Sequence, residues 1–500
     1  MHDTPPSSTE TALDAPPDVP VSAPSTARRV MVNTASLAGS SLWRIFISFV
    51  LQVLITRVLG VAAFGQYVSA LAYLNVAQVV SELGLTTLLV RDLAPAPGQR
   101  RAYYRLALKL QTGAAVVTWG GLIVLAVLLP VSTATRDALW LAGASLPFYA
   151  VTSASQTLFK ASERMELVMG VEAVINTLIM TASIGVLLTG GGVTFLIGVL
   201  VATQAISALL CLWLVRRQRL LAPPQADTPI DLRRLWQELR PFYWLSLADV
   251  LLHRLDIILL NIVTTDLVTG IYSIAYSVVR VGVKLIQSFW QALYPTLSRL
   301  HRQARQQYTT LSRVSLRYGL MAVLPAAGIG TGVAAAGLTL LYGPEALASV
   351  RTFQILLWLT PLFLAEMYGV IQLMVVHATR ASLMVTWVHI GAVLLLLPVL
   401  TLFYQAEGAA VAMVAAGALG VVTARWLARQ VGIPFAVRGL SVLLGTTLLV
   451  TALALWLPLA WPLRAAVAGL VYAVVMWITG IIAPGDRAVL RKAFRTPTAE

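Results

Sequence analysis

The sequence predicts an all-α polytopic membrane protein, and three observations lead to this fold class. Hydrophobic residues make up 58% of the 500 residues, whereas charged residues make up only 11%; ordinary soluble domains are about 25% charged. Apolar runs of about 20 residues, long enough for a helix to cross roughly 30 Å of hydrocarbon, recur along most of the chain. Basic residues gather in alternate connections between these runs. An ordinary soluble protein is therefore excluded.

About fourteen membrane-spanning helices are predicted from these runs. The first six centre on 31–58, 64–90, 106–130, 138–160, 167–189 and 193–215, and the next six on 242–263, 267–294, 316–342, 352–376, 381–403 and 408–428. The last two are 439–457 and 461–483. The predicted organisation is a disordered cytoplasmic tail (1–29), a six-helix bundle (30–216), a cytoplasmic linker (217–240), a second six-helix bundle (241–430), two additional transmembrane helices (431–484) and a basic cytoplasmic tail (485–500).

A short motif occurs at equivalent places in the two predicted bundles. Gly65-Gln66-Tyr67-Val68-Ser69-Ala70 opens the second span, and Gly270-Ile271-Tyr272-Ser273-Ile274-Ala275 lies near the start of the eighth. Both segments read Gly-x-Tyr-x-x-Ala. Because many transporters consist of internal repeats, we interpret the motif as the mark of a parallel repeat, with the last two spans as an appendage.

The distribution of basic residues predicts the orientation in the membrane. Cytoplasmic loops carry an excess of Lys and Arg, and the largest group here lies between the sixth and seventh spans: Arg216, Arg217, Arg219, Arg233, Arg234 and Arg240. The opposite connections are short and hold few basic residues. Both termini are therefore expected in the cytoplasm, with the protein in the cell (inner, cytoplasmic) membrane. The net charge of +15 reflects this topology, and no nucleic-acid partner is expected.

Basic residues also lie inside the apolar runs, where a charge costs roughly 2.5–3.5 kcal/mol. The simplest explanation is a polar cavity with a cationic wall inside a helix bundle, which suits an anionic substrate. The planar guanidinium of arginine matches phosphate in particular. The alternative is a scatter of side chains that snorkel to the interface. The candidate residues for binding the anion are Arg44, Arg254, Arg280 and Lys284.

Other polar side chains share helical faces with these cations. At about 100° per residue, one face of the eighth span carries two tyrosines, Arg280, Lys284 and two glutamines within about 120°. The second and fourth spans group polar residues in the same way, although hydrogen bonds between helices are an alternative role for such residues. The candidate lining residues, for sugar contacts, are Asn75, Gln78, Tyr149, Gln156, Tyr272, Tyr276, Gln287 and Gln291.

Four carboxylates within the spans are candidates for binding a coupling proton or Na⁺: Asp249, Asp256, Glu82 and Glu366. For Asp256 an ion pair with Arg254, or with an arginine of another helix, is the alternative. His253 is either a packed polar residue or part of a proton relay.

Several chemistries are excluded by pattern. No Gly-x-x-x-x-Gly-Lys-Ser/Thr segment is present, so no ATP-binding phosphate loop is expected. No group of His, Cys and carboxylates has metal-site spacing, and we expect no cofactor. The brief extracytoplasmic connections argue against a membrane enzyme such as a glycosyltransferase or ligase. Movement of a substrate must therefore be driven by an ion gradient, the membrane potential, a substrate gradient or a partner.

Two stretches resemble a known family. Thr56-Arg57-Val58-Leu59-Gly60 with Phe64-Gly65-Gln66-Tyr67, and Gly84-Leu85 followed by Arg91-Asp92-Leu93-Ala94, are similar to polysaccharide transporters. These are the O-antigen and exopolysaccharide flippases of the multidrug/oligosaccharidyl-lipid/polysaccharide (MOP) superfamily. With span count, topology and repeat included, the likeness covers nearly the whole chain.

The resemblance implies two six-helix bundles that form a V around a cavity opening alternately to each side. It implies as substrate a polyprenyl-pyrophosphate-linked oligosaccharide, flipped from the cytoplasmic to the outer leaflet for surface polysaccharide biosynthesis while its tail stays among the membrane lipids. A polysaccharide polymerase is an expected partner. The peptidoglycan-precursor (lipid II) flippase and the multidrug/cation antiporter of the same superfamily are the alternative functions.

Overall fold

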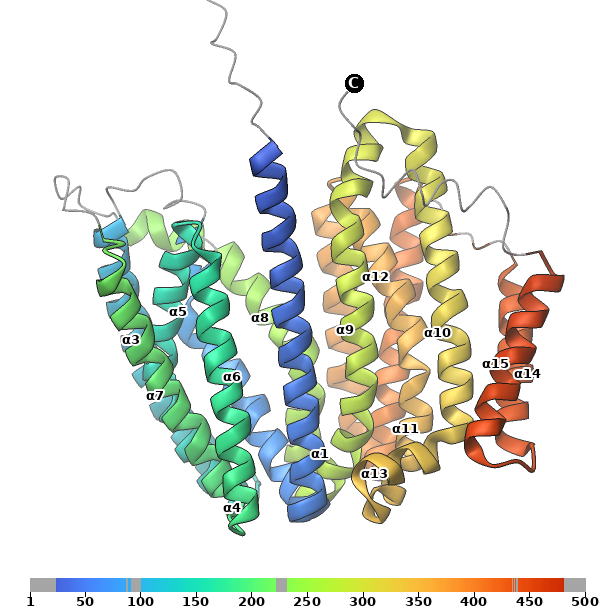
Figure 1. The fold of residues 1–500 in the computed structure, drawn as a ribbon, viewed down its shortest axis with the longest axis horizontal. Coiled ribbons are helices and arrows are strands. Elements are labelled where there is room, and N and C mark those ends of the chain that lie inside the picture. Colours follow the sequence, from blue (N-terminus) through green and yellow to red (C-terminus); the bar gives the residue numbers. More distant parts are fainter. Residues whose placement is uncertain are drawn as a thin grey trace, which may run out of the picture.

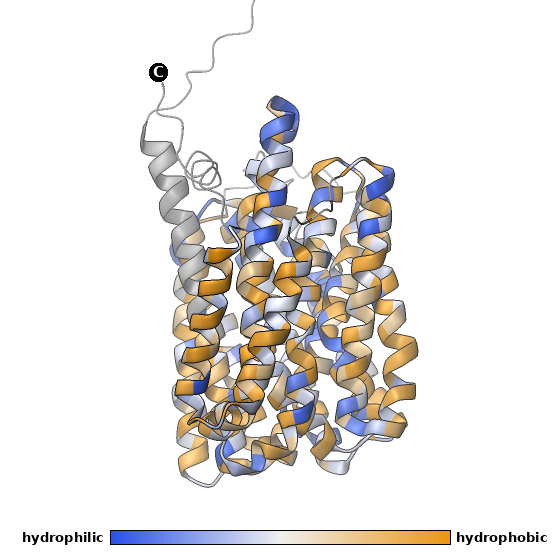
Figure 2. Cartoon of the chain, turned by 90° about the vertical axis from the view of Figure 1, so that its right-hand side faces the viewer, coloured by the Kyte–Doolittle hydropathy of each residue, from blue (hydrophilic) through white to orange (hydrophobic). Residues whose placement is uncertain are grey.

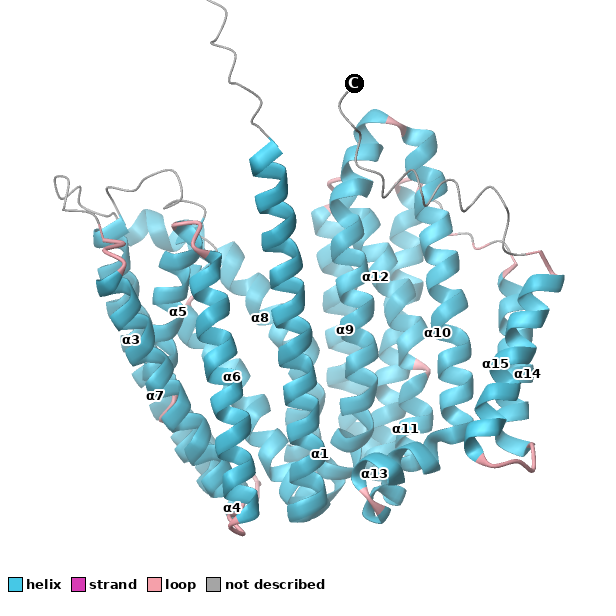
Figure 3. Cartoon of the chain, in the orientation of Figure 1, coloured by secondary structure: helices cyan, strands magenta, loops and turns pink. Residues whose placement is uncertain are grey.

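The structure, a computed structural model, describes residues 24–86, 89–90, 100–221, 232–433, 435, 437 and 439–480. Side chains are described from Phe46 onward, except those of residues 232 and 234. Every regular element in this part of the chain is helical (Figure 3). Most of the predicted N-terminal tail and the whole predicted C-terminal tail lie outside the described residues.

The helices follow the predicted apolar runs closely. The N-terminal half forms α1 (Pro24–Glu82), α3 (Arg100–Leu128), α4 (Thr133–Gly143), α5 (Leu146–Ala161), α6 (Met165–Leu188) and α7 (Val193–Arg217). The C-terminal half forms α8 (Leu232–Val263), α9 (Asp266–Gln303), α10 (Arg305–Tyr342), the 3₁₀ helix η2 (Pro344–Ser349), α11 (Val350–Leu357), α12 (Leu359–Val375), α13 (Thr379–Gln430), α14 (Leu440–Trp456) and α15 (Trp461–Ile478).

Two of these helices each contain a sharp bend that divides them in two. In α1 the bend is at Gly60, with φ 84° and ψ 174°, and in α13 it is at Gln405, with φ 48° and ψ −127°. A positive φ is easily reached by glycine but is strained for glutamine. The bends fall between the first and second predicted spans and between the eleventh and twelfth, so each long helix supplies two of the predicted spans.

The surface is that of a protein embedded in lipid. Nine described helical segments are long and apolar enough to cross a membrane, and Leu440–Trp456 is a shorter apolar helix. Large apolar side chains such as Val117, Leu395 and Trp456 are 74–84% exposed. The outer faces are mostly hydrophobic over the middle of the molecule, and hydrophilic residues gather toward its ends (Figure 2). Lipid tails are the environment that such a surface requires.

The helices form two groups that approach each other most closely at one end. In Figure 1, α3 to α7 lie on one side and α9 to α13 on the other, with α1 and α8 between them. The groups diverge toward the upper face, where α1 begins and α15 ends. Helices α14 and α15 stand at the edge, where α14 packs against α10: a Cβ on Gly332 would lie 2.4 Å from that of Ala454.

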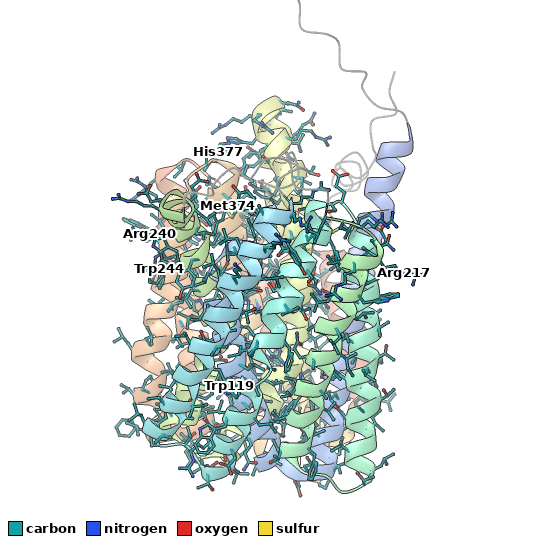
Figure 4. The ribbon with its side chains drawn as sticks, turned by 90° about the vertical axis from the view of Figure 1, so that its left-hand side faces the viewer. Trp119, Arg217, Arg240, Trp244, Met374 and His377 are labelled. Atoms are coloured by element: carbon teal, nitrogen blue, oxygen red, sulfur yellow. The ribbon has the colours of Figure 1, made fainter. Side chains whose placement is uncertain are left out.

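Basic side chains lie at the upper end of the molecule. Arg217 and Arg240 project from that end of the molecule, with His377 near the top, whereas Trp119 lies in the lower half (Figure 4). This placement agrees with the topology predicted from the basic residues, although it does not test which side of a membrane the upper face occupies.

Candidate functional site

A cavity lined by several of the predicted residues lies between the two groups of helices. Its volume is about 560 Å³, and its walls come from α1, α8 and α9. We call it the central cavity. Three of the four predicted cations line it: Arg254 from α8, and Arg280 and Lys284 from α9. The predicted lining residues Asn75, Gln287 and Gln291 face the same space.

Helical spacing explains how α9 presents this row of polar groups. Residues three or four apart lie on one face of a helix, so Arg280, Lys284, Gln287 and Gln291 form one stripe along the cavity. Neighbouring groups hold the charged ends in place. The Arg280 guanidinium (Nη2) donates to Gln52 Oε1 at 3.2 Å across to α1, and Lys284 Nζ donates to Gln287 Oε1 at 2.9 Å.

One buried carboxylate, Asp256, lies near enough to the arginines of the cavity to interact with them, but it forms no direct ion pair with either in the described part of the chain. Among the described residues, neither Arg254 nor Arg280 forms a salt bridge with a carboxylate. Asp256, for which an ion pair with Arg254 or with another arginine was an alternative role, is buried and accepts a hydrogen bond from the Tyr272 hydroxyl at 2.7 Å. The cavity therefore keeps a net positive wall. The side chain of Arg44, the fourth predicted cation, lies outside the described residues.

Two of the predicted lining tyrosines do not reach the central cavity. Tyr272 is fully buried against Asp256, and Tyr276 stacks on it with ring centroids 5.7 Å apart. At about 100° per residue, the α9 residues that line the cavity, which include Ser277, Val281 and Ser288, also span about 120°, but this sector is shifted around the helix so that both tyrosines fall outside it. Of the predicted stripe, Arg280, Lys284, Gln287 and Gln291 face the central cavity, and Tyr272 and Tyr276 do not. Gln78, half-buried on α1, lines neither this cavity nor the two described next.

A second cavity, of about 320 Å³, lies within the N-terminal group. Glu82 lines this cavity, and its Oε1 accepts hydrogen bonds from the Tyr149 hydroxyl at 2.6 Å and from the Ser153 hydroxyl at 3.0 Å. Lys160 and Glu172 line the same space. Tyr149 and Gln156, which we expected to contact sugar in the main cavity, belong here instead.

The remaining predicted carboxylates are split between buried and exposed positions. Glu366 on α12 is buried and lines a third, small cavity in the C-terminal group. Asp249 is 71% exposed on α8, although its backbone carbonyl lies 2.8 Å from His253 Nδ1. Asp249, His253 and Asp256 of α8 thus take an exposed, a cavity-lining and a buried position.

Sequence reasoning missed several residues of these sites. Gln52 and Tyr67 of α1 line the central cavity, and His389 of α13 is bonded to Glu366. His389 had a detectable signal, because an imidazole in the apolar run Val385–Leu400 needs a buried partner. Gln52 and Tyr67 had none beyond lying on a helix with other polar residues.

Comparison with known proteins places the chain in a family. Residues 30–301 match the family described as polysaccharide biosynthesis protein. The match covers more than half of the sequence. The chain belongs to this family. No match is found among curated proteins.

Solved structures show the same fold. The structure described as "Lipid II flippase MurJ, inward closed conformation" aligns with a TM-score of 0.71 and 11% identity over 89% of this chain and 98% of that one. An inward-facing multidrug resistance MATE transporter of the MOP superfamily aligns with a TM-score of 0.64 and 12% identity over 78% and 94%. A MOP superfamily transporter from Pyrococcus furiosus aligns with 0.52 and 12% over 80% and 93%. At these identities the likeness establishes the fold.

Proposed function

We propose that the protein flips a polyprenyl-pyrophosphate-linked oligosaccharide from the cytoplasmic to the outer leaflet for cell-surface polysaccharide biosynthesis. The observation that carries the proposal is the central cavity, which combines Arg254, Arg280 and Lys284 with amide side chains. Family membership supplies the link to polysaccharide biosynthesis.

The chemistry of the cavity suits both parts of such a head group. Removing a pyrophosphate from water is costly unless cations and donors replace its hydration shell, and guanidinium groups do this with paired hydrogen bonds. The amides of Asn75, Gln287 and Gln291 both donate and accept, as sugar hydroxyls require. The polyprenyl tail remains among the membrane lipids, where it needs no protein contact.

The proposed organisation has two six-helix bundles, residues 30–216 and 241–430, joined by the linker 217–240 and followed by two helices within 431–484. Fourteen spans and cytoplasmic termini belong to the same proposal. The upper face in Figure 1 would then be cytoplasmic, and the diverging helices would give the cytoplasmic leaflet access to the cavity. Rocking of the bundles about their lower contacts would turn the cavity outward.

A gradient of H⁺ or Na⁺ is the proposed driving force, with the half-buried Glu82 and the buried Asp256 and Glu366 as candidate sites. Asp249 is a weaker candidate because its side chain is largely exposed. A polymerase that consumes the flipped oligosaccharide is the proposed partner.

The test is translocation by purified protein in sealed vesicles that hold a polyprenyl-pyrophosphate oligosaccharide, with sugar exposure measured by an impermeant oxidising enzyme. Arg254→Gln and Arg280→Gln should each slow flipping about 10-fold or more, since a lost charged hydrogen bond is worth roughly 1.5–3 kcal/mol. Arg351→Gln, at a side chain that is 81% exposed, is the matched control. Wild-type rates in both cavity variants would contradict the proposal.

The same vesicle assay distinguishes two alternative functions from the proposed one. Faster flipping of lipid II than of the pyrophosphate-linked oligosaccharide would favour the peptidoglycan-precursor function, for which the fold similarity to MurJ is the supporting observation. Export of a cationic drug would favour the antiporter function, which a cavity lined by three cations opposes.

A further inference from the structure

The third cavity, inside the C-terminal group of helices, is lined by a carboxylate and an imidazole that are hydrogen-bonded to each other. Nδ1 of His389 (α13) lies 3.0 Å from both carboxylate oxygens of Glu366 (α12). The two side chains are only 5% and 7% exposed. Gly420 makes room for the carboxylate, because a Cβ there would lie 2.5 Å from Glu366 Oε1. The pair is thus built into the packing of α12 against α13.

A second imidazole faces the same cavity. Nδ1 of His253 lies 2.8 Å from the Asp249 carbonyl oxygen, which can only accept, so this nitrogen carries a hydrogen. The other nitrogen, Nε2, is buried and has no hydrogen-bond partner in the described part of the chain. An imidazole held in this way presents a lone pair that can take up a proton.

The cavity suits a proton better than a metal cation. Its volume is about 60 Å³, room for a few water molecules. Hard cations require a cage of about six oxygen ligands, whereas the oxygens here belong to Glu366, Tyr276 and Thr386 and most other lining groups are apolar. The titratable side chains on its described walls are His253 of α8, Tyr276 of α9, Glu366 of α12 and His389 of α13. Charged groups outside the walls also act on His253: Asp249 Oδ1 lies 3.8 Å from its Nδ1, and Arg254 and Lys284 lie close enough to repel a proton on it.

Two helices separate this cavity from the central one. Helix α8 turns His253 to the small cavity and the adjacent Arg254 to the central cavity. Helix α9 likewise turns Tyr276 to one and Arg280 to the other. A change of charge in the small cavity therefore acts directly on the helices that carry the cationic wall.

We propose that Glu366 and His389 form a proton-exchange site, reached through His253, that couples proton movement to translocation; this inference rests on the proposed flippase function. The pair holds one proton between carboxylate and imidazole and is then neutral overall. Release of that proton to water leaves a carboxylate anion beside a neutral imidazole. A lone charge in a small, mostly apolar cavity is unfavourable, so the deprotonated site favours a conformation in which more water enters, and uptake of a proton restores the closed packing.

The first experiment uses purified protein without any lipid-linked substrate, so that it does not depend on the flippase function. Infrared difference spectra between acidic and neutral pH should show the carboxyl and imidazole bands of the pair in the wild type. They should be lost in Glu366→Gln and shifted along the pH axis in His389→Gln. Glu407→Gln, at a partly exposed carboxylate on α13, should leave them unchanged.

Two results would overturn the site. One is a spectrum of Glu366→Gln identical to that of the wild type. The other is binding of radioactive sodium by the wild type that is lost in Glu366→Gln. If Glu366→Gln does not fold, the milder variant His389→Gln provides the test. Infrared bands that change at the same pH in His389→Gln as in the wild type would contradict a proton shared by the two side chains.

Coupling is tested next in vesicles carrying the oligosaccharide lipid. An imposed pH gradient should accelerate flipping by the wild type, whereas Glu366→Gln should flip at one rate with or without it. Equal acceleration in both proteins would contradict the coupling role. A wild type that does not flip the lipid at all would contradict the proposed function, while the spectra would still report on the site.

Discussion

Gly65 and Gly270 lie against each other where α1 crosses α9. A Cβ on Gly65 would lie 2.8 Å from the backbone nitrogen of Gly270 and 2.0 Å from the carbonyl oxygen of Asp266. A Cβ on Gly270 would lie 2.1 Å from the carbonyl oxygen of Val61. These are the first residues of the two Gly-x-Tyr-x-x-Ala motifs, so the repeated motif marks a contact between its own two copies.

This crossing predicts that neither glycine tolerates a side chain. Gly270→Val should lower the stability of the observed conformation by roughly 1–3 kcal/mol or more, because overpacking forces the two backbones apart. The fall is measured as the thermal unfolding midpoint of the purified protein. Gly113→Val is the control, since its Cβ would meet nothing within 4 Å. Equal midpoints for both variants would show that the crossing does not hold the two groups together.

Asp266 ties the same region together through hydrogen bonds. Its Oδ2 accepts from Ser132 at 2.6 Å, and its Oδ1 accepts from Thr135 at 2.9 Å and from Asn261 at 3.1 Å. Asp266→Ala should therefore destabilise the protein by roughly 1–3 kcal/mol. Asp137→Ala, an exposed carboxylate on α4, should change the unfolding midpoint much less. A similar change in both would mean that the bonds from Ser132 and Thr135 contribute little.

Cysteine labelling distinguishes a wet central cavity from a dry interface. In a Cys211→Ser background, which removes the buried native thiol, Arg280→Cys and Gln287→Cys should react with a water-soluble maleimide. Leu395→Cys, whose leucine is 74% exposed on α13, should face lipid and react slowly. Protection of the first two to the level of the third would contradict a water-filled cavity.

The Glu82 site predicts an energetic coupling within the N-terminal group. Tyr149→Phe removes the 2.6 Å hydrogen bond to the carboxylate and should cost roughly 1.5–3 kcal/mol, the range for bonds to charged groups. In a double-mutant cycle with Glu82→Gln, the combined effect should be clearly smaller than the sum of the two. Tyr404→Phe, at a 65% exposed tyrosine, is the control. Strict additivity would indicate that the two side chains do not act together.

Much of the fold could be read from the sequence because each apolar run is a local property. The run around 267–294 becomes α9 and that around 193–215 becomes α7, since a backbone in lipid must satisfy its hydrogen bonds within one helix. The cations Arg254, Arg280 and Lys284 were identified for the same reason: their cost in hydrocarbon depends on depth along a helix.

Which side chains contact one another, by contrast, was decided only by the tertiary structure. Periodicity places Tyr272 and Arg280 in one sector of α9, but helix packing buries the first against Asp256 and leaves the second in the cavity. Helix packing also places Glu82 within hydrogen-bond distance of hydroxyl groups, and Glu366 within hydrogen-bond distance of an imidazole 23 residues away in the chain. Hydropathy along one helix carries no information about which helix lies opposite, because that depends on side-chain fit between segments distant in the chain. The sequence alone thus determined a helical membrane protein with charged residues inside its apolar runs, and the packing of the helices decided which charges share a cavity.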